Sequence, residues 1–374
     1  MTTDVYERLA DYLDQLPAGF PRTEGGAEIR ILRQLFSPEE ASMAMHVSLI
    51  AEEPRVIAYR AGISLDKAAH LLHEMDCKGL IFSIKEKDRP LRYRMQQFIV
   101  GFWEQQVYSL TPDLVRDFEE YLPEFVNLDT WQKVPQLRVI PVNKSISVVD
   151  TILPYEHVFE LINEYSEFTV FDCICRKEQR ILGKGCNKPL ESCLNFGPPT
   201  ERNRRLNRGR IIGRSEVIDI LYNAEKAGLV LQTGNARNTL YICTCCGCCC
   251  GVLRSLKRDS RPASRVSSPF RVKLDSDKCS GCGICLDRCQ MDALSLNDGK
   301  AVVNTDRCIG CGLCVSTCST GAMTLQRKPK NEQSYVPVNL TETYIKLGQV
   351  RGKMSILDLI GLKIRSIRDR VLSH

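Results

Sequence analysis

Long apolar runs are missing from this sequence of 374 residues, and none of its hydrophobic segments is long enough to span a bilayer. The first residues contain acidic side chains and no apolar core, so we expect no signal peptide. Neither a G-x-G-x-x-G motif after a strand nor a G-x-x-x-x-G-K-[ST] phosphate loop occurs, which argues against nucleotide and flavin sites. Histidine is scarce, and none of the 5 histidines pairs into a zinc-hydrolase motif. We therefore predict a cytoplasmic protein without a transmembrane segment.

Cysteine, by contrast, is abundant, and 18 of its 19 residues fall into two dense groups. One group lies between Cys279 and Cys318, the other lies between Cys173 and Cys250, and Cys77 stands apart. Clustered cysteines without an export signal indicate metal binding in a reducing compartment rather than disulfides. The net charge of +6 is mild for this length and gives no reason by itself to expect nucleic acid.

The C-terminal group of cysteines consists of one motif that is repeated once. C-S-G-C-G-I-C-L-D-R-C begins at Cys279, and C-I-G-C-G-L-C-V-S-T-C begins 29 residues later at Cys308. Asp277, Ala293 and Leu296 recur at the same offset, so the repeat extends beyond the cysteines. Each half has the C-x2-C-x2-C-x3-C spacing of an iron–sulfur cluster loop. A pair of structural zinc sites is the alternative, but four-cysteine zinc sites usually show two well-separated C-x2-C pairs.

The spacing also predicts which cysteines share a cluster. Two-residue gaps let one tight loop place three thiolates on a cubane, and glycines in the gaps let the backbone bend close to sulfur. The fourth cysteine of each run is expected to reach the cluster of the other loop. The first cluster would then be held by Cys279, Cys282, Cys285 and Cys318. The second would be held by Cys308, Cys311, Cys314 and Cys289.

Residues 270–328 resemble a bacterial two-cluster ferredoxin, and this doubled motif carries the resemblance. It implies a ferredoxin-like domain with two [4Fe–4S] clusters of low potential. The sequence departs from the family where proline usually follows the fourth cysteine, because these positions hold Gln290 and Ser319. Each restores a backbone N–H that proline lacks, and a hydrogen bond from it to a cluster sulfur would raise the reduction potential.

Residues 22–125 are predicted to form a winged-helix-like module. Helices are expected to start at Pro38, to run from Pro54 to Ala61, and to follow the capping residue Ser64 as far as Gly79. Two β-like runs then flank a charged turn at residues 87–90, which predicts a hairpin.

The charge of this module favours docking or dimerisation over DNA recognition. On the candidate recognition helix, Lys67 and Lys78 are opposed by three acids, which are Asp66, Glu74 and Asp76. A DNA-binding helix normally adds several cations to offset phosphate charge. We therefore expect at most weak, non-specific DNA binding through the wing residues Arg89, Arg92 and Arg94.

Residues 136–256 are predicted to form a cysteine-rich α/β domain in which two strands end in cysteines. One strand over residues 168–175 would deliver Cys173 and Cys175, with Cys186 and Cys193 in the loop after it. A second strand would lead into a run of six, which are Cys243, Cys245, Cys246, Cys248, Cys249 and Cys250. Adjacent cysteines such as Cys245 and Cys246 project in different directions, so both cannot easily serve one cubane.

These ten thiols have three interpretations. Crowding so many thiols together has no packing advantage, and unmetallated they would be open to oxidation. We favour at least one additional iron–sulfur cluster, with zinc or a dithiol redox relay as the alternatives. The sequence does not say which of the ten are ligands.

Residues 329–374 are predicted to form a tail that ends in a basic amphipathic helix over residues 355–372. Its apolar face is expected to contain Ile356, Leu359, Ile360, Ile364, Ile367 and Val371. Such a helix can pack on its own chain, bind a partner or lie on an anionic membrane.

Together these features predict an α+β multidomain iron–sulfur protein that passes electrons between protein partners. The order of C-x-C-R, C-C-x-C-C-C and two ferredoxin loops is similar to that of uncharacterised electron-transfer proteins of anaerobic bacteria. Two alternatives stay open, a cluster-based redox-sensing transcription regulator and an electron-delivering or catalytic subunit of an anaerobic reductase. The sequence thus leaves open whether the chain is an enzyme. The expected partners are redox proteins or a second copy of the chain, and nucleic acid is not expected.

Overall fold

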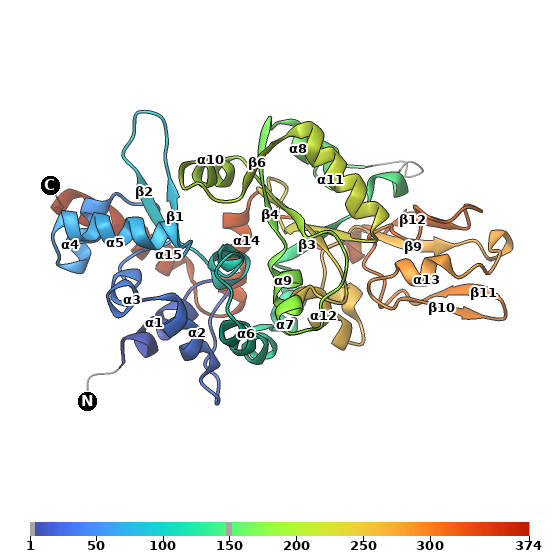
Figure 1. The fold of residues 1–374 in the computed structure, drawn as a ribbon, viewed down its shortest axis with the longest axis horizontal. Coiled ribbons are helices and arrows are strands. Elements are labelled where there is room, and N and C mark those ends of the chain that lie inside the picture. Colours follow the sequence, from blue (N-terminus) through green and yellow to red (C-terminus); the bar gives the residue numbers. More distant parts are fainter. Residues whose placement is uncertain (1–3, 147–151, 374) are drawn as a thin grey trace. The chain divides into compact units, whose positions relative to one another are not determined.

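A computed structural model describes residues 4–146 and 152–373 of the chain (Figure 1). The chain divides into two compact units. The first combines residues 1–126 with residues 344–374, and the second contains residues 127–343. No described helix is long and apolar enough to cross a membrane.

The first unit is largely helical. Its helices before residue 126 are α1 (Val5–Asp14), α2 (Ala27–Leu35), α3 (Pro38–Ala44), α4 (Pro54–Ala61), α5 (Leu65–Cys77) and α6 (Pro112–Phe125). Phe98 lies in an aromatic core with Phe20 and Tyr121, while Trp103 stacks on Phe118 with 3.9 Å between ring centroids. Aromatic side chains provide much of the apolar area that a unit of this size can bury.

The predicted helix signals of this unit are confirmed. Ser37 and Glu40 form a reciprocal capping box at the start of α3. Gly62 ends α4 in the left-handed conformation, with φ at +67°, and the Ser64 side chain caps α5. The hairpin is also confirmed, because β1 (Ile81–Ile84) pairs antiparallel with β2 (Arg92–Met95). The winged-helix assignment itself stays a prediction.

The tail contains α14 (Leu340–Val350) and α15 (Ile356–Leu372). Within the first unit, α15 packs against α4 through its polar side. Arg60 Nε on α4 lies 2.9 Å from Asp369 Oδ2 on α15, and both side chains are largely buried. Arg60 also pairs with the buried carboxylate of Glu52. The apolar residues predicted for the opposite side of this helix are mostly exposed, including Ile360, Ile364, Ile367 and Val371.

The second unit is built on a six-stranded sheet with the order β3-β7-β8-β5-β4-β6. These strands are β3 (Leu137–Ile140), β4 (Glu167–Asp172), β5 (Glu191–Phe196), β6 (Arg210–Gly213), β7 (Val230–Gly234) and β8 (Tyr241–Cys245). Every pairing in it is antiparallel, so this domain is α+β and the α/β prediction was wrong. A short turn between β7 and β8 brings them together as a hairpin, which needs no helical crossover.

Helices accompany the sheet of the second unit (Figure 1). They are α7 (Leu128–Lys133), α8 (Val158–Asn163), α9 (Ile174–Ile181), α10 (Pro198–Arg205), α11 (Arg214–Lys226) and α12 (Gly251–Arg258). Two of these helices start directly after a cysteine, because Cys173 is the N-cap of α9 and Cys250 is the N-cap of α12.

The last part of this unit is a module of two antiparallel strand pairs with the short helix α13 (Ile284–Arg288) (Figure 1). One pair is a hairpin of β10 (Leu294–Asn297) and β11 (Lys300–Val303). The other joins β9 (Phe270–Leu274), before the doubled motif, to β12 (Met323–Arg327), after it. Phe270, Val272 and Leu325 form part of its core together with the sulfurs of Cys308 and Cys314.

Candidate metal centres

The two cysteine loops of the doubled motif are shaped by glycines. Gly281 has φ at +70° and Gly310 has φ at +67°, conformations that L side chains rarely adopt. A Cβ on Gly281 would lie 2.0 Å from the carbonyl oxygen of Gly299, and one on Gly310 would lie 2.2 Å from that of Phe270. The predicted need for tight bends in the gaps of the motif is therefore confirmed.

Backbone N–H groups point at several cysteine sulfurs of this module. The nitrogen of Ala293 donates to Cys289 Sγ at 3.2 Å, and that of Ala301 donates to Cys279 Sγ at 3.4 Å. These bonds favour thiolates, and the one from Ala301 is the main cause of a lowered pKa for Cys279. Burial has the opposite effect on the Cys311 thiol and raises its pKa to about 12. Metal binding would displace that proton.

The second loop forms a small apolar pocket. Its lining includes the cysteines Cys308, Cys311 and Cys314 of that loop together with Cys289 from the first. Cys318 lies near the first loop, because its negative charge acts to raise the pKa values of Cys279 and Cys285. The structure thus groups each fourth cysteine with the opposite loop, while the exchanged ligation stays a prediction.

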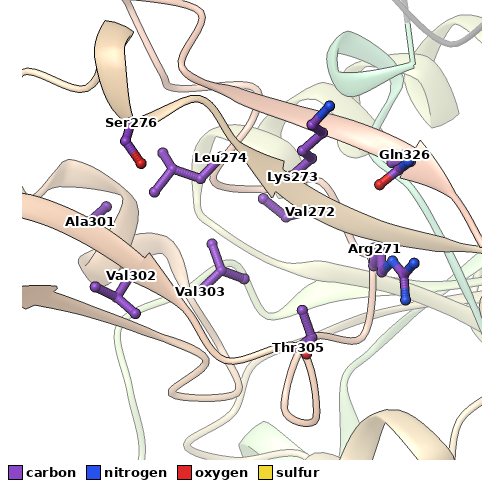
Figure 2. Close-up of a pocket in the computed structure, with 10 residues that line it drawn as sticks. All are labelled: Arg271, Val272, Lys273, Leu274, Ser276, Ala301, Val302, Val303, Thr305 and Gln326. Atoms are coloured by element: carbon purple, nitrogen blue, oxygen red, sulfur yellow. The ribbon is translucent and has the colours of Figure 1, made fainter.

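A larger open pocket of about 410 Å³ lies on the same module, between β9 and β11 (Figure 2). Arg271, Lys273 and Gln326 contribute polar atoms, and Val272, Leu274 and Val303 contribute apolar side chains. None of the ten middle-region cysteines lines it. This pocket therefore gives no substrate route to those thiols.

Four of the ten middle-region thiols converge on one point, which we call the four-thiol site. Its members are Cys186, Cys246, Cys248 and Cys249, and their sulfurs all lie within 4.8 Å of one another. The sulfur of Cys186 lies 3.9 Å from that of Cys246 and 3.6 Å from that of Cys249. The edge of a tetrahedron of sulfurs around one ion is about 3.8 Å, for a metal–sulfur bond of about 2.3 Å. The site can therefore hold a metal ion.

The ferredoxin-like cysteines provide a comparison within the same molecule. Among the described residues, the four-thiol site is the one group of three or more potential ligands found at such close mutual spacing. The eight cysteines of the doubled motif are spread more widely, as expected for ligands on different corners of a cubane. The close spacing thus distinguishes the four-thiol site from the cluster loops.

The other six thiols form a closed ring, which we call the six-thiol ring. Each sulfur lies close enough to the next to shift its pKa, in the order Cys173, Cys175, Cys250, Cys245, Cys243, Cys193 and back to Cys173. Cross-strand pairing produces one link, because Cys193 on β5 lies directly opposite Cys243 on β8. Cys173, Cys245 and Cys250 are buried, and the other three are partly buried.

The structure corrects the predicted positions of three of these thiols and confirms one geometric prediction. Strand β4 ends at Asp172, so Cys173 is the N-cap of helix α9 and Cys175 lies in that helix, instead of both lying on the strand. Cys193 lies on β5 and not in a loop, because it continues the ladder with Phe171 and Cys243. Cys245 belongs to the ring and Cys246 to the four-thiol site, as expected from adjacent residues that project in different directions.

The sequence reasoning missed Arg176, which lies beside both thiol groups. Its side chain is fully buried, and its terminal nitrogens donate to the carbonyl oxygen of Thr244 at 2.9 and 3.0 Å. One of them also lies 3.8 Å from Cys246 Sγ, and another donates to the Ser192 hydroxyl. Burial by itself lowers the pKa of Arg176, but the surrounding cysteine sulfurs hold it above its usual value. The only available signal was its place directly after Cys175.

Gln290 makes a second contact that the sequence did not reveal. Its side-chain Oε1 accepts a hydrogen bond of 2.8 Å from the backbone nitrogen of Gly247, between Cys246 and Cys248. A Cβ on Gly247 would lie 2.2 Å from the Gln290 carbonyl oxygen. Nearby, Arg288 donates to the carbonyl oxygens of Glu225 and Lys226. The end of the first ferredoxin-like loop is therefore held against the four-thiol site, whereas the predicted N–H bond from Gln290 to a cluster sulfur stays a prediction.

Comparison with known proteins agrees with the doubled motif. The model of the 4Fe-4S dicluster domain matches residues 271–319. The chain is 52% identical over 33 residues to Ferredoxin-2 of Desulfomicrobium norvegicum and 46% identical over 33 residues to Ferredoxin-3 of Desulfocurvibacter africanus. Each match covers 9% of this chain, and the chain spans 56% and 54% of the two relatives. No solved structure gave a significant match.

These matches concern the module that contains both cysteine loops and strand β9. A dicluster domain binds two [4Fe–4S] clusters, and the eight thiols of the doubled motif are enough for both. Residues 271–319 of this chain form a 4Fe-4S dicluster domain of the ferredoxin type.

Proposed function

We propose that this protein transfers electrons between protein partners through the two [4Fe–4S] clusters of its dicluster domain and a further metal centre in the middle region. The dicluster domain is the observation that carries the proposal, because clusters of this kind exchange single electrons at low potential. The contact of Gln290 with Gly247 supports a role for the middle region in the same path. It holds the loop that ends in Cys289 against the four-thiol site.

Anaerobic purification of the full chain tests this function. We expect at least about eight irons and eight acid-labile sulfides per chain, as two cubanes require. Dithionite should bleach the visible absorption and give electron paramagnetic resonance signals of two interacting reduced clusters. Addition of an oxidised ferredoxin should restore the absorption. A protein that binds the iron but is not reversibly reduced would contradict the proposal.

The four-thiol site is proposed to hold a single zinc or iron ion. Sulfur–sulfur separations of 3.6–3.9 Å support this, since the corners of a cubane would spread the ligands more widely. A lone zinc ion cannot change its oxidation state at this site, and in that case the site would stabilise the loop that contacts Gln290. Metal analysis of variants in this site decides between zinc and iron.

The winged-helix-like module is proposed to dock or dimerise rather than to read DNA. Several of its exposed cations form ion pairs with nearby acidic side chains, and this lowers the positive charge that is available to bind phosphates. Lys67 pairs with Glu39 at 3.2 Å, and Arg89 pairs with Glu86 at 2.9 Å. Arg92 also pairs with Glu86. Protein docking fits this balanced surface better than a DNA backbone does.

The exposed face of α15 is proposed as the docking surface for an acidic partner helix. Leu357, Ile360, Ile364, Ile367 and Val371 follow one another at alternating spacings of three and four residues and are all exposed. This is the a/d seam of a coiled coil, with β-branched residues at four of its five positions. Such a seam is normally covered by another helix.

The charges beside this seam favour a partner over a second copy of the chain. Lys363 and Arg370 flank it in the positions that face a partner helix. Two copies of α15 would bring these cations together, which is unfavourable, whereas an acidic helix would complement them. Asp369 does not reduce the charge at the seam, because it is buried against Arg60 on the other side of the helix.

A further inference from the structure

We propose that the six-thiol ring holds a polynuclear iron–sulfur cluster that is separate from the metal ion of the four-thiol site. The inference deepens the proposed electron-transfer function and rests on it for the biological role of the cluster. The existence of the cluster itself is argued from the geometry of the ring. It divides the ten middle-region thiols into two centres of different kinds.

The first argument is the number of sulfurs. One zinc or iron ion is satisfied by four thiolates in a tetrahedron, and the four-thiol site already has that arrangement. The ring has six thiols grouped around the paired strands β5 and β8, so it has more ligands than one ion can use. Several metal ions bridged by sulfide would use all six. Iron and sulfide are the components that the dicluster domain of the same chain already requires.

The second argument is the structural origin of the ring. Its thiols come from two neighbouring strands and from the starts of two helices, so the supporting backbone is regular throughout. Cys173 and Cys250 are the N-caps of α9 and α12, where the helix dipoles stabilise negative charge. A site built to hold thiolates is expected to place sulfur at such positions. An apolar core that only fills space does not require cysteines at the N-caps of helices.

The third argument is the buried cation Arg176. A guanidinium group that is fully removed from water is costly unless negative charge lies nearby. Its terminal nitrogens donate hydrogen bonds to neutral oxygens of Thr244 and Ser192, while its buried Nε has no hydrogen-bond partner among the described residues. Sulfurs of the ring and of the four-thiol site lie around it, with Cys246 Sγ at 3.8 Å, and cysteines that bind a metal do so as thiolates. Metal-bound thiolates therefore supply the charge that this burial requires.

Metal analysis of the full chain tests the proposal. In protein purified without oxygen, we expect iron and acid-labile sulfide clearly above the roughly eight of each that two cubanes contain. The double variant Cys193→Ser and Cys243→Ser removes two neighbouring ring ligands with little change in volume. Its iron and sulfide should fall together to the level of the two cubanes.

Two controls make the result specific. The double variant Cys186→Ser and Cys248→Ser in the four-thiol site should lose a single metal ion and no sulfide. Cys77→Ser, at the exposed cysteine outside both groups, should match the unaltered chain. Retained iron and sulfide in the ring variant would overturn the proposal. Loss of zinc instead of iron from it would do so too, by assigning a zinc–thiolate cluster to the ring.

Mössbauer spectroscopy of the unaltered protein provides a test that needs no variant to fold. We expect iron signals of the dicluster cubanes and an additional, sulfide-bridged iron population. A spectrum that contains only the cubanes, with or without one mononuclear iron, would overturn the ring cluster. Ring iron without reversible reduction would leave the cluster in place and contradict the electron-transfer function instead.

Discussion

Replacement of Arg176 by methionine should weaken metal binding at the four-thiol site without unfolding the protein. Methionine has a similar length and no charge, so it fills the space of the arginine side chain without the cation. Arg176 is a buried cation, and metal ligation fixes the cysteines beside it as thiolates. In the metal-bound protein, it faces thiolates, and one of its nitrogens lies 3.8 Å from Cys246 Sγ. The substitution therefore acts mainly on the metal-bound state.

The size of the effect follows from this distance. A unit positive charge 3.8 Å from a thiolate contributes roughly 4 kcal/mol at an effective dielectric constant of about 20. The guanidinium charge is spread over three nitrogens, and the metal withdraws charge from sulfur, so we take roughly a third of that value. About 1.4 kcal/mol corresponds to a tenfold higher metal dissociation constant.

Chelator titration of the anaerobic protein measures this change. The metal of the four-thiol site should be removed at roughly tenfold lower chelator strength in Arg176→Met than in the unaltered chain. Arg138→Met is the matched control, because Arg138 is also buried but donates to the Ala236 carbonyl oxygen and lies over the Tyr155 ring. An unchanged chelator midpoint in Arg176→Met, with its far-ultraviolet spectrum intact, would refute the reasoning.

Four other outcomes are expected. Cys318→Ala should damage the cluster of the first loop and Cys289→Ala that of the second, as seen by electron paramagnetic resonance, and the reverse assignment would refute the ligand exchange. Gln290→Ala removes a hydrogen bond of about 1 kcal/mol and should speed hydrogen exchange of the Gly247 amide roughly fivefold, while an unchanged rate would show that the contact does not hold this loop. Ile364→Glu should leave visible absorption and a monomeric mass by light scattering unchanged, whereas a dimer of the unaltered chain that this variant dissociates would assign the α15 face to a second copy. Duplex DNA should bind only weakly and lose affinity steeply with salt, and a site bound at nanomolar affinity in physiological salt would restore the sensor hypothesis.

The dicluster domain was determined by the sequence alone. Its ligand spacing is local, because three cysteines within seven residues must share one loop whatever surrounds them. The glycines of the gaps follow from the same constraint, and Gly281 and Gly310 have the positive φ angles that it requires. The helix starts at Ser37 and Ser64 were equally predictable, since a capping side chain bonds within three residues of itself.

The division of the middle thiols was decided by the tertiary structure. Cys193 and Cys243 are 50 residues apart, and they meet only because β5 and β8 are neighbours in the sheet. The local sequence pattern predicted that the side chains of Cys245 and Cys246 would point in different directions. It could not predict which other thiols each of them would lie beside. That choice depends on strand order and register, which are set by the packing of the whole sheet.

The burial of Arg176, the contact of Gln290 with Gly247 and the exposed side of α15 also depend on tertiary packing. An arginine or glutamine in a sequence is normally exposed, and nothing local marks one that is enclosed by distant thiols or bonded to a distant loop. The amphipathic pattern of α15 predicted an apolar face but not its burial. The ion pair between Arg60 and Asp369 fixes the polar side of that helix against α4 and leaves the apolar seam open. Sequence periodicity determines which residues share a face, and only long-range contacts determine which face is covered.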